Sequence, residues 1–422
     1  MSRKYEICGS QHYKQGITQP PGQPMNYIWQ HKHWPQFSYD SSKLSALAYH
    51  YAKQAAQLSG RLAPTDQDDA VAAQLDLMVD EAINTSLIEG ENLNPASVRS
   101  SLQHFLNLAF GLNLPPAPTN VADVKAEGMA ALLVDVRKHF NQPLSKEMLF
   151  NWHRMVLAGF EDNILHSDLT VGQWRDSPEP MQIVSGPVGY ERVHYEAPAA
   201  QDLDALMADF LNWFNQQDTH PEDQQNKQQI PGVIRAGIAH LWFEVIHPFD
   251  DGNGRIGRAI IEYALAQDLG MPVMLSMSTH IERNKKEYYR QLNAASCCDA
   301  SELDDPAVLD ITVWLSWFIE TLIAAQQEAA EKVATIFAKT EFWQRHKNTE
   351  LSERQKTVLN KIFKAGQAGF PNGVSAQKYA ALGKCSKATA TRDLADLLAK
   401  DCVRSEGVGR GLRYFLNTEG ML

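Results

Sequence analysis

The chain has 422 residues, 44% of them hydrophobic and 21% charged, with a formal net charge of −11 at pH 7. This length predicts two or three domains, and the composition is that of an ordinary globular protein. No apolar run follows a basic stretch at the N-terminus, and polar residues interrupt the longest apolar segments, so we expect neither secretion nor a membrane span. The five cysteines fit neither a disulfide framework nor a zinc knuckle, which favours a reducing cytoplasm.

The first 65 residues are predicted to form an N-terminal arm with a helical extension. Residues 27–40 carry two tryptophans and a proline among apolar residues, and an Ala-rich helical stretch follows. We expect this arm to pack against the main domain, and it offers no catalytic chemistry.

A helical core is predicted over residues 66–306, followed by a connecting helix over 307–349. Apolar residues recur with the spacing of one helix face in residues 71–87, 203–214 and 233–245. One segment differs, because "PMQIVSGPVGYERVHYEAP" alternates apolar and polar residues on both sides of its glycines, which predicts a β-hairpin. The expected fold class is therefore mainly α, a helical bundle with one hairpin.

The segment "HPFDDGNGRIGR", residues 247–258, joins two of these helices. Pro248 ends the helix before it, and helical periodicity resumes after Gly254 and ends at a glycine. Successive glycines let backbone N–H groups turn toward one point as an anion nest, and the next helix directs its positive N-terminus there. We therefore expect a phosphate at this loop.

Several side chains of the same segment suit phosphate chemistry. Arg255 and Arg258, three residues apart on one helix face, would bind phosphate oxygens. Asp251 supplies a hard oxygen ligand for Mg²⁺, and His247 can accept a proton from an incoming hydroxyl near neutral pH. The alternative is a capped turn with solvated arginines, but the combination favours a phosphoryl- or nucleotidyl-transfer site. Phe249 would then be the core anchor of the loop.

This segment matches at each position the signature HPFx(D/E)GNGRxxR and so resembles the Fic family, whose members typically transfer AMP from ATP to a hydroxyl side chain of a target protein. With its helical surroundings and upstream hairpin, the resemblance covers residues 70–300. It implies that His247 is the general base and that Asp251 binds Mg²⁺. It further implies an anion hole and a pair of phosphate-binding arginines, formed by Gly252, Asn253, Gly254, Arg255 and Arg258.

The resemblance also gives roles to the hairpin and to a pair of tyrosines. The hairpin resembles the family's flap, which binds the target segment by strand addition. Its residues would border the active site: Ile183, Val184, Ser185, Gly186, and Val193 to Tyr195. Tyr288 and Tyr289 resemble the wall of the family's adenine pocket, with core packing as the alternative. Ser296 stands where some members carry an asparagine, which weakens that assignment.

A second motif, "TSLIEG" at residues 85–90, places a carboxylate on an apolar helix face. Glu89 follows Ala82 by seven residues and so lies about 20° from it around the helix, and a carboxylate there requires a partner. The motif resembles the family's inhibitory sequence (S/T)xxxE(G/N), at Thr85, Glu89 and Gly90. The resemblance implies a bidentate pair with Arg258 that withdraws this arginine from the γ-phosphate of ATP. A purely structural ion pair is the alternative.

Residues 350–422 differ in charge from the rest of the chain, with 12 Lys and Arg against 7 Asp and Glu, whereas the preceding residues have 27 against 43. Their pattern of three helices and a Gly-rich hairpin resembles a winged helix-turn-helix. The exposed start of its recognition helix would present Lys387, Thr389, Thr391 and Arg392. We expect DNA binding, with a protein-interaction or dimerisation module as the alternative.

Together these features predict a self-inhibited protein adenylyltransferase that uses ATP and Mg²⁺ and modifies a Ser, Thr or Tyr of a target protein. One alternative is a nucleotide-sensing DNA-binding transcription regulator, although a sensor has no need of a base such as His247. The other is a Fic enzyme that moves a different group or removes AMP. The target protein and the DNA site do not follow from the sequence, and a homodimer is left open.

Overall fold

The computed structural model of the chain describes residues 4–6, 26–62, 67–112, 114, 123–159, 169–185, 192–216, 230–299 and 302–418. The chain divides into two compact units, one of residues 1–63 and 74–327 and the other of residues 64–73 and 328–422. Helices dominate the described residues and the strands are short, so the prediction of a mainly α fold is confirmed. Within these ranges no helix has the length and apolar character that crossing a membrane requires.

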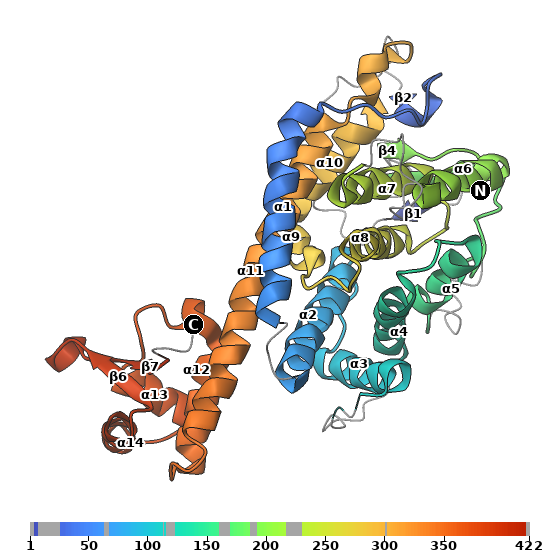
Figure 1. Ribbon diagram of the computed structural model, residues 1–422. Helices are drawn as coiled ribbons and strands as arrows, with labels where there is room; N and C mark the ends of the chain where they lie inside the picture. The colour runs from blue at the N-terminus through green and yellow to red at the C-terminus, as the bar shows by residue number, and fades with distance from the viewer. Residues whose placement is uncertain are drawn as a thin grey trace. The chain divides into compact units, whose positions relative to one another are not determined.

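Helices α7 (Gly232–Ile246) and α8 (Asn253–Leu269) lie side by side at the centre of the first unit (Figure 1). Every residue of α7 is buried, which explains its nearly continuous apolar sequence. Gly252 and Gly270 bound α8 with φ of 83° and 66°, the left-handed region that glycine adopts without strain. The predicted helix-loop-helix is therefore present, with residues 247–252 as its loop.

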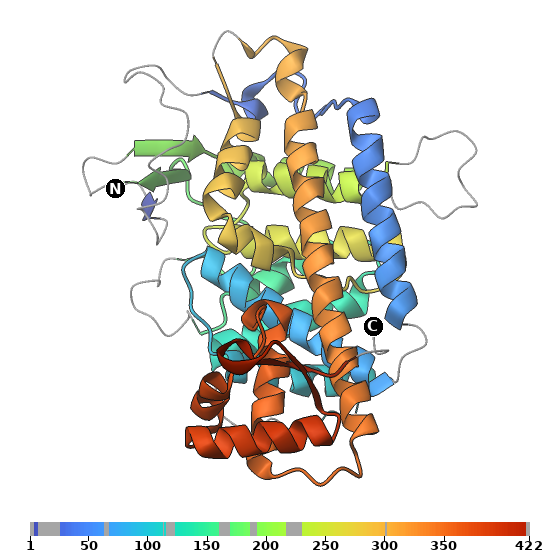
Figure 2. The same ribbon diagram turned by 90° about the vertical axis from the view of Figure 1, so that its left-hand side faces the viewer.

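The other helices of the first unit pack against this pair or against one another, as a second view shows (Figure 2). The cap of α3 illustrates how the sequence fixes their starts, because the side chain of Asn94 accepts from the backbone N–H groups of Ala96 and Ser97. In chain order the helices are α1 (Ser41–Leu62), α2 (Gln67–Ile88), α3 (Pro95–Phe110), α4 (Val124–His139), α5 (Lys146–Val156), α6 (Leu203–Gln216), α9 (Met277–Arg283), α10 (Lys285–Ser296) and α11 (Thr312–Arg345). Both α2 and α11 also contribute residues to the second unit.

Strands β3 (Gln182–Ser185) and β4 (Arg192–Glu196) form the antiparallel pair that the alternating segment predicts. Strand β1 (Lys4–Glu6) lies parallel to β3 and completes a three-stranded sheet. Strand β2 (Asn26–Tyr27) pairs with β5 (Cys297–Cys298), and the rings of Trp34 and Phe37 contact Trp242 of α7. The N-terminal arm is thus packed against the main helices, as expected. Gly186 and the predicted turn of the hairpin lie outside the described residues.

The second unit contains the predicted order of three helices and a hairpin. These elements are α12 (Glu353–Gly369), α13 (Ala376–Gly383), α14 (Lys387–Ala399), β6 (Val403–Glu406) and β7 (Arg413–Leu416). Their core includes Phe363, Tyr379 and Leu394. Helix α13 ends at Gly383, and its left-handed cap residue is Lys384, with φ of 47°.

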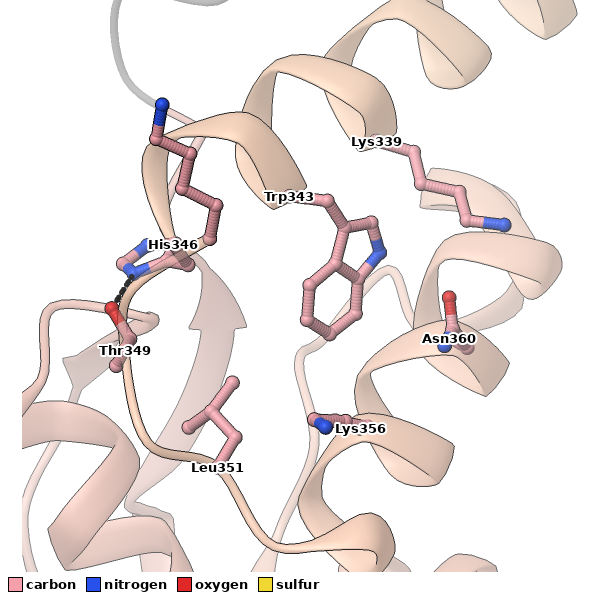
Figure 3. A pocket seen from close by; sticks show the side chains of 8 residues that line it. Lys339, Trp343, His346, Thr349, Leu351, Lys356 and Asn360 are labelled. Carbon is pink, nitrogen blue, oxygen red and sulfur yellow. Dashed lines mark hydrogen bonds between the residues drawn. The ribbon is translucent and has the colours of Figure 1, made fainter.

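A cavity of about 410 Å³ lies between the end of α11 and the start of α12 in this unit (Figure 3). Trp343 projects into its middle, and His346 at one end lies 3.2 Å from the hydroxyl of Thr349. Its cationic lining consists of Lys339, Lys347 and Lys356. None of these lysines belongs to α14.

Candidate functional site

His247 occupies the first position of the loop between α7 and α8. Its backbone is left-handed, with φ of 49° and ψ of 63°, an unusual conformation for a residue with a Cβ atom. Arg175, which is buried, holds this conformation because its Nε donates to the carbonyl of His247 at 2.9 Å and its backbone N–H donates to Pro248 at 3.0 Å. Backbone strain of this kind is often found at functional positions.

The imidazole of His247 is suited to accepting a proton. Burial, and then the charge of Arg175, lowers its pKa to about 4. The ring is therefore neutral at neutral pH. Its Nδ1 is buried and has no hydrogen-bond partner among the described residues.

Phe249 and Asn253 brace the loop from inside. Phe249 is fully buried and stacks on His153, with 4.0 Å between ring centroids, so it is the anchor that the sequence suggested. The side chain of Asn253 accepts from the N–H of Phe249 at 3.0 Å and donates to its carbonyl at 2.8 Å. This side chain is thus engaged within the loop, and only the backbone of Asn253 can contribute to an anion hole.

Asp251 lies at the open side of the loop, with 42% of its side chain exposed. Its Oδ1 accepts from the N–H of Gly252 at 2.6 Å and lies 3.6 Å from Nη2 of Arg255. No group of three metal-binding side chains occurs among the described residues. A single carboxylate nevertheless fits Mg²⁺, which proteins commonly bind through one or two carboxylates plus substrate phosphates.

Two buried arginines on α8 present unused donors beside this loop. The side chains of Arg255 and Arg258 are each only 2% exposed. Arg255 Nε and Arg258 Nη1 are buried without a hydrogen-bond partner in the described structure. Buried donors are almost always satisfied, so these two atoms point to a missing anion. The first backbone N–H groups of α8 would serve the same anion.

The motif at residues 85–90 occupies this anion site from the end of α2. Glu89 Oε1 accepts from Arg258 Nη2 at 2.6 Å, while Arg258 Nε donates to the hydroxyl of Thr85 at 2.7 Å. The structure therefore brings together the pair that the resemblance implies, but through one N–O contact instead of a bidentate pair. Burial acts to raise the pKa of Glu89, but the charge of Arg258 outweighs it and the pKa falls below its usual range.

Glu89 also lies directly against the start of α8. A Cβ atom added to Gly254 would stand 2.3 Å from Glu89 Oε1 and 3.1 Å from Arg258 Nη1. A side chain at position 254 would therefore displace the end of Glu89. The carboxylate of Glu89 is therefore in the position where the sequence predicts a phosphate.

The hairpin is attached to α7 close to His247. The hydroxyl of Tyr195 donates to the carbonyl of Val245 at 2.5 Å. Val184 and Tyr195 are buried, whereas Ile183 keeps partial exposure. The side chain of Ser185 and the whole of Gly186 lie outside what the structure describes, so their predicted contacts stay predictions.

The two tyrosines of α10 differ in their surroundings. Tyr288 is 1% exposed, and its hydroxyl lies 3.0 Å from Nε2 of His240 in the core. Tyr289 is partly exposed, and its hydroxyl lies 3.5 Å from the carbonyl of Ile88. Ser296 donates to Leu292 of its own helix at 2.7 Å. Tyr289 is therefore better placed than Tyr288 to contact a base.

Sequence reasoning missed three charged residues around the site. Arg175 carried no signal, because its partners are backbone carbonyls far along the chain. Glu91 contacts Arg255, and only its position two residues after Glu89 could have drawn attention. Glu244 is buried beside Gly257, and burial raises its pKa to about 8. A carboxylate within the apolar run of α7 was a visible signal for this third residue.

At the start of α14, three of the four predicted residues are exposed. These are Lys387, Thr391 and Arg392. Thr389 is half-buried, and its backbone N–H and hydroxyl both contact the cap residue Ser386. The basic residues are thus accessible, whereas Thr389 helps to start the helix.

Comparisons with known proteins identify a family model and several relatives of part of the chain. Residues 143–265 match the model described as Fic/DOC family, and residues 27–108 match a domain of unknown function, DUF4172. A protein adenylyltransferase of Caenorhabditis briggsae is 32% identical over 93 residues, 22% of this chain and 16% of that protein. A protein adenylyltransferase Fic of Drosophila yakuba is 30% identical over 151 residues, 32% of this chain and 27% of that protein. The chain therefore aligns with less than a third of the length of these relatives.

Two solved structures resemble the chain at low sequence identity. A Fic family protein from Desulfovibrio desulfuricans G20 is 18% identical, with a TM-score of 0.47, covering 89% of this chain and 97% of that chain. A Fic domain containing signaling protein from Bacteroides thetaiotaomicron is 19% identical, with a TM-score of 0.47, covering 67% of this chain and 97% of that chain.

Proposed function

The chain belongs to the Fic/DOC family through residues 143–265, and we propose on this premise that it is a protein adenylyltransferase. It transfers AMP from ATP to a Ser, Thr or Tyr hydroxyl of a target protein. The observation that carries the proposal is the junction of α7 and α8. There a neutral histidine, two buried arginines with unused donors and a helix N-terminus meet at one loop.

His247 would act as the general base. A neutral imidazole can take the proton of the target hydroxyl while its oxygen forms a bond to the α-phosphorus of ATP. The bond from that phosphorus to the bridging oxygen breaks, and diphosphate leaves. Gly252, Gly254 and the backbone of Asn253 would line the anion hole, and Arg255 and Arg258 would hold the phosphates.

Asp251 would hold Mg²⁺, which supplies charge neutralisation of the phosphates when bound. The target segment would bind the hairpin by addition of a strand. At Ile183 it would have to replace β1, because Tyr5 of β1 pairs with Ile183. Tyr289, with Tyr288 behind it, would contact the adenine. These assignments rest on the position of the hairpin and of α10 relative to the loop.

Glu89 would inhibit this reaction within the same chain. The contacts that support this proposal are the ion pair to Arg258 and the approach to Gly254. A carboxylate there competes with a phosphate for both groups, so ATP would bind without the orientation that attack requires. The alternative, that Glu89 serves removal of AMP from a modified target, uses the same contacts.

Incorporation of labelled AMP tests the proposal. Glu89→Gly should raise automodification by tenfold or more over wild type, because Arg258 becomes available to ATP. Adding His247→Ala should reduce the rate on the order of 10²-fold or more, the scale for loss of a general base. Asp204→Asn is a matched control, since it also removes one carboxylate, an exposed one on α6.

Three outcomes would contradict parts of the proposal. Unchanged transfer in the His247→Ala variant would exclude His247 as base. Label from UTP in place of ATP would identify another transferred group. If Glu89→Gly gains no transfer and loses removal of AMP from a modified target, Glu89 is a catalytic group for that removal.

A second function is favoured by the basic start of α14. Exposed Lys387 and Arg392 at the N-terminal end of a helix that follows a helix and turn suit contact with DNA phosphates. We propose that the second unit binds duplex DNA, which would make the chain an adenylyltransferase with a DNA-binding module. A protein-interaction or dimerisation role remains the alternative to be separated by experiment.

A further inference from the structure

Glu91 stands two residues after Glu89, and its side chain contacts the other phosphate-binding arginine. We infer that Glu91 is a second inhibitory carboxylate, one that limits nucleotide affinity by occupying Arg255. This inference rests on the proposed nucleotide site and extends its regulation. Glu89 and Glu91 would then engage Arg258 and Arg255 one to one.

The backbone after α2 makes this double contact feasible. Gly90 has φ of 83°, and the N–H of Glu91 donates to the carbonyl of Ser86 at 2.9 Å. This glycine-capped end turns the chain so that residues 89 and 91 both face α8. Arg255 and Arg258, three residues apart, lie on that face. We call residues 85–91 the inhibitory segment. Its two carboxylates, Glu89 and Glu91, each contact one of the two arginines.

Each oxygen of Glu91 has its own cation. Oε2 lies 2.5 Å from Nη1 of Arg255, and Oε1 lies 2.8 Å from Nζ of Lys125 on α4. The Glu91 side chain is 16% exposed and that of Arg255 is 2% exposed. A charged pair so shielded from water is screened less than a surface pair. Salt should therefore weaken this contact less than it weakens a surface ion pair.

A nucleotide phosphate would meet this contact directly. Arg255 is left with a buried unused Nε, but its Nη1 is occupied by Glu91. A phosphate that binds the guanidinium through two parallel hydrogen bonds must displace Glu91 or share the arginine with it. The carboxylate also repels the negative phosphates. Removal of Glu89 alone leaves this obstacle in place.

The two carboxylates should consequently affect different quantities. Glu89 lies against Gly254 and Arg258 and would mainly govern the orientation of bound ATP. Glu91 lies on Arg255 and Lys125 and would mainly govern how tightly ATP binds. Glu89→Gly should therefore increase the transfer rate more than the affinity, and Glu91→Gln should do the reverse.

Equilibrium binding of ATP with Mg²⁺ to the full chain tests the inference, with His247→Ala present throughout to prevent turnover. Glu91→Gln keeps the shape of the side chain and removes its charge, and it should lower the Kd for ATP by about tenfold. Asp204→Asn, the exposed control, should leave the Kd unchanged. Thermal melting of each variant checks that it is folded.

A second comparison tests the route through Arg255. In an Arg255→Ala background, Glu91→Gln should no longer tighten binding by tenfold, because the competition is gone. A tenfold gain in ATP affinity in that background would contradict the proposal that Glu91 competes with ATP for Arg255. An unchanged or weaker affinity of folded Glu91→Gln would show instead that Glu91 positions Arg255 for the ligand.

These outcomes separate the inference from the proposed function. Tighter ATP binding without AMP transfer by the Glu89→Gly variant would keep the role of Glu91 and revise the activity. Transfer without any effect of Glu91→Gln on affinity would keep the activity and overturn the inference. No ATP binding by any variant, including one that lacks both carboxylates, would overturn both.

Discussion

His247 combines a left-handed backbone with a pKa that burial lowers first and the charge of Arg175 second. The guanidinium of Arg175 fixes the carbonyl of His247 and adds positive charge beside its ring. Burial lowers the pKa of Arg175 itself to about 10, so this side chain stays charged at neutral pH. Arg175 thus holds the backbone of the proposed base and adds to the effect of burial on its protonation state.

The pH dependence of transfer follows from this pKa. With a pKa of about 4, His247 is neutral across the range from pH 8 to 5.5. We therefore expect kcat/KM of the Glu89→Gly variant to stay nearly constant over that range. An unshifted histidine, with a pKa near 6.5, would lose about tenfold by pH 5.5. Such a loss, with ATP affinity measured in parallel and unchanged, would contradict a lowered pKa in the working enzyme.

At the residue scale, the sequence predicts those site residues that lie close together along the chain. His247, Asp251, Arg255 and Arg258 fall within twelve positions, so one local pattern reveals them. Arg175 and Glu91 act through contacts with distant segments, which no local spacing encodes. The resemblance implies a bidentate pair of Glu89 and Arg258, but the structure has one N–O contact because Thr85 takes the Nε of Arg258.

At the scale of elements, helix geometry was predictable and helix contacts were not. The loop residues Pro248 and Gly252 fix where α7 ends and α8 begins. The burial of Tyr288 depends on how α10 meets His240 of α7, and periodicity gives no such pairing. Periodicity likewise does not tell which helical glycines lie against a neighbouring helix. Gly128 of α4 is one, because an added Cβ would stand 2.1 Å from the backbone oxygen of Met155.

Two glycine substitutions in helices should change stability in opposite directions. Gly128→Ala should destabilise the protein by about 1–3 kcal/mol, because the clash is with backbone and α4 or α5 must move. Gly60→Ala in α1 should stabilise it by up to ~1 kcal/mol, since nothing lies within 4 Å of the added atom. Unfolding of the full chain in denaturant measures both. An equal change in the free energy of unfolding for the two variants would show that helix propensity alone determines their stability.

At the scale of the whole molecule, charge is distributed unevenly along the chain. The acidic excess lies before residue 350 and the basic excess after it. The sequence predicts the helix order of the second unit. Which side chains line its surfaces needed coordinates, as the half-buried Thr389 and the lysine-lined cavity between α11 and α12 illustrate.

DNA binding by the full chain should fall steeply as salt rises. Lys387→Ala with Arg392→Ala should weaken binding and reduce the slope of log K against log salt by about 2, because each substitution leaves one phosphate without its cation. Lys339→Ala with Lys347→Ala removes the same charge from the cavity and serves as the matched control (Figure 3). Equal weakening by the two double variants would indicate non-specific attraction. No binding at low salt would favour a protein-interaction or dimerisation module.

The inhibitory segment and the arginines it engages belong to one polypeptide, which sets how the inhibition responds to concentration. The connection from Glu91 to Arg255 through the chain gives the carboxylates a fixed effective concentration at the site. Inhibition of this kind does not become weaker when the protein is diluted or stronger when the protein is more abundant. A free inhibitor would act in proportion to its abundance, whereas this segment would hold each molecule at the same fraction of full activity.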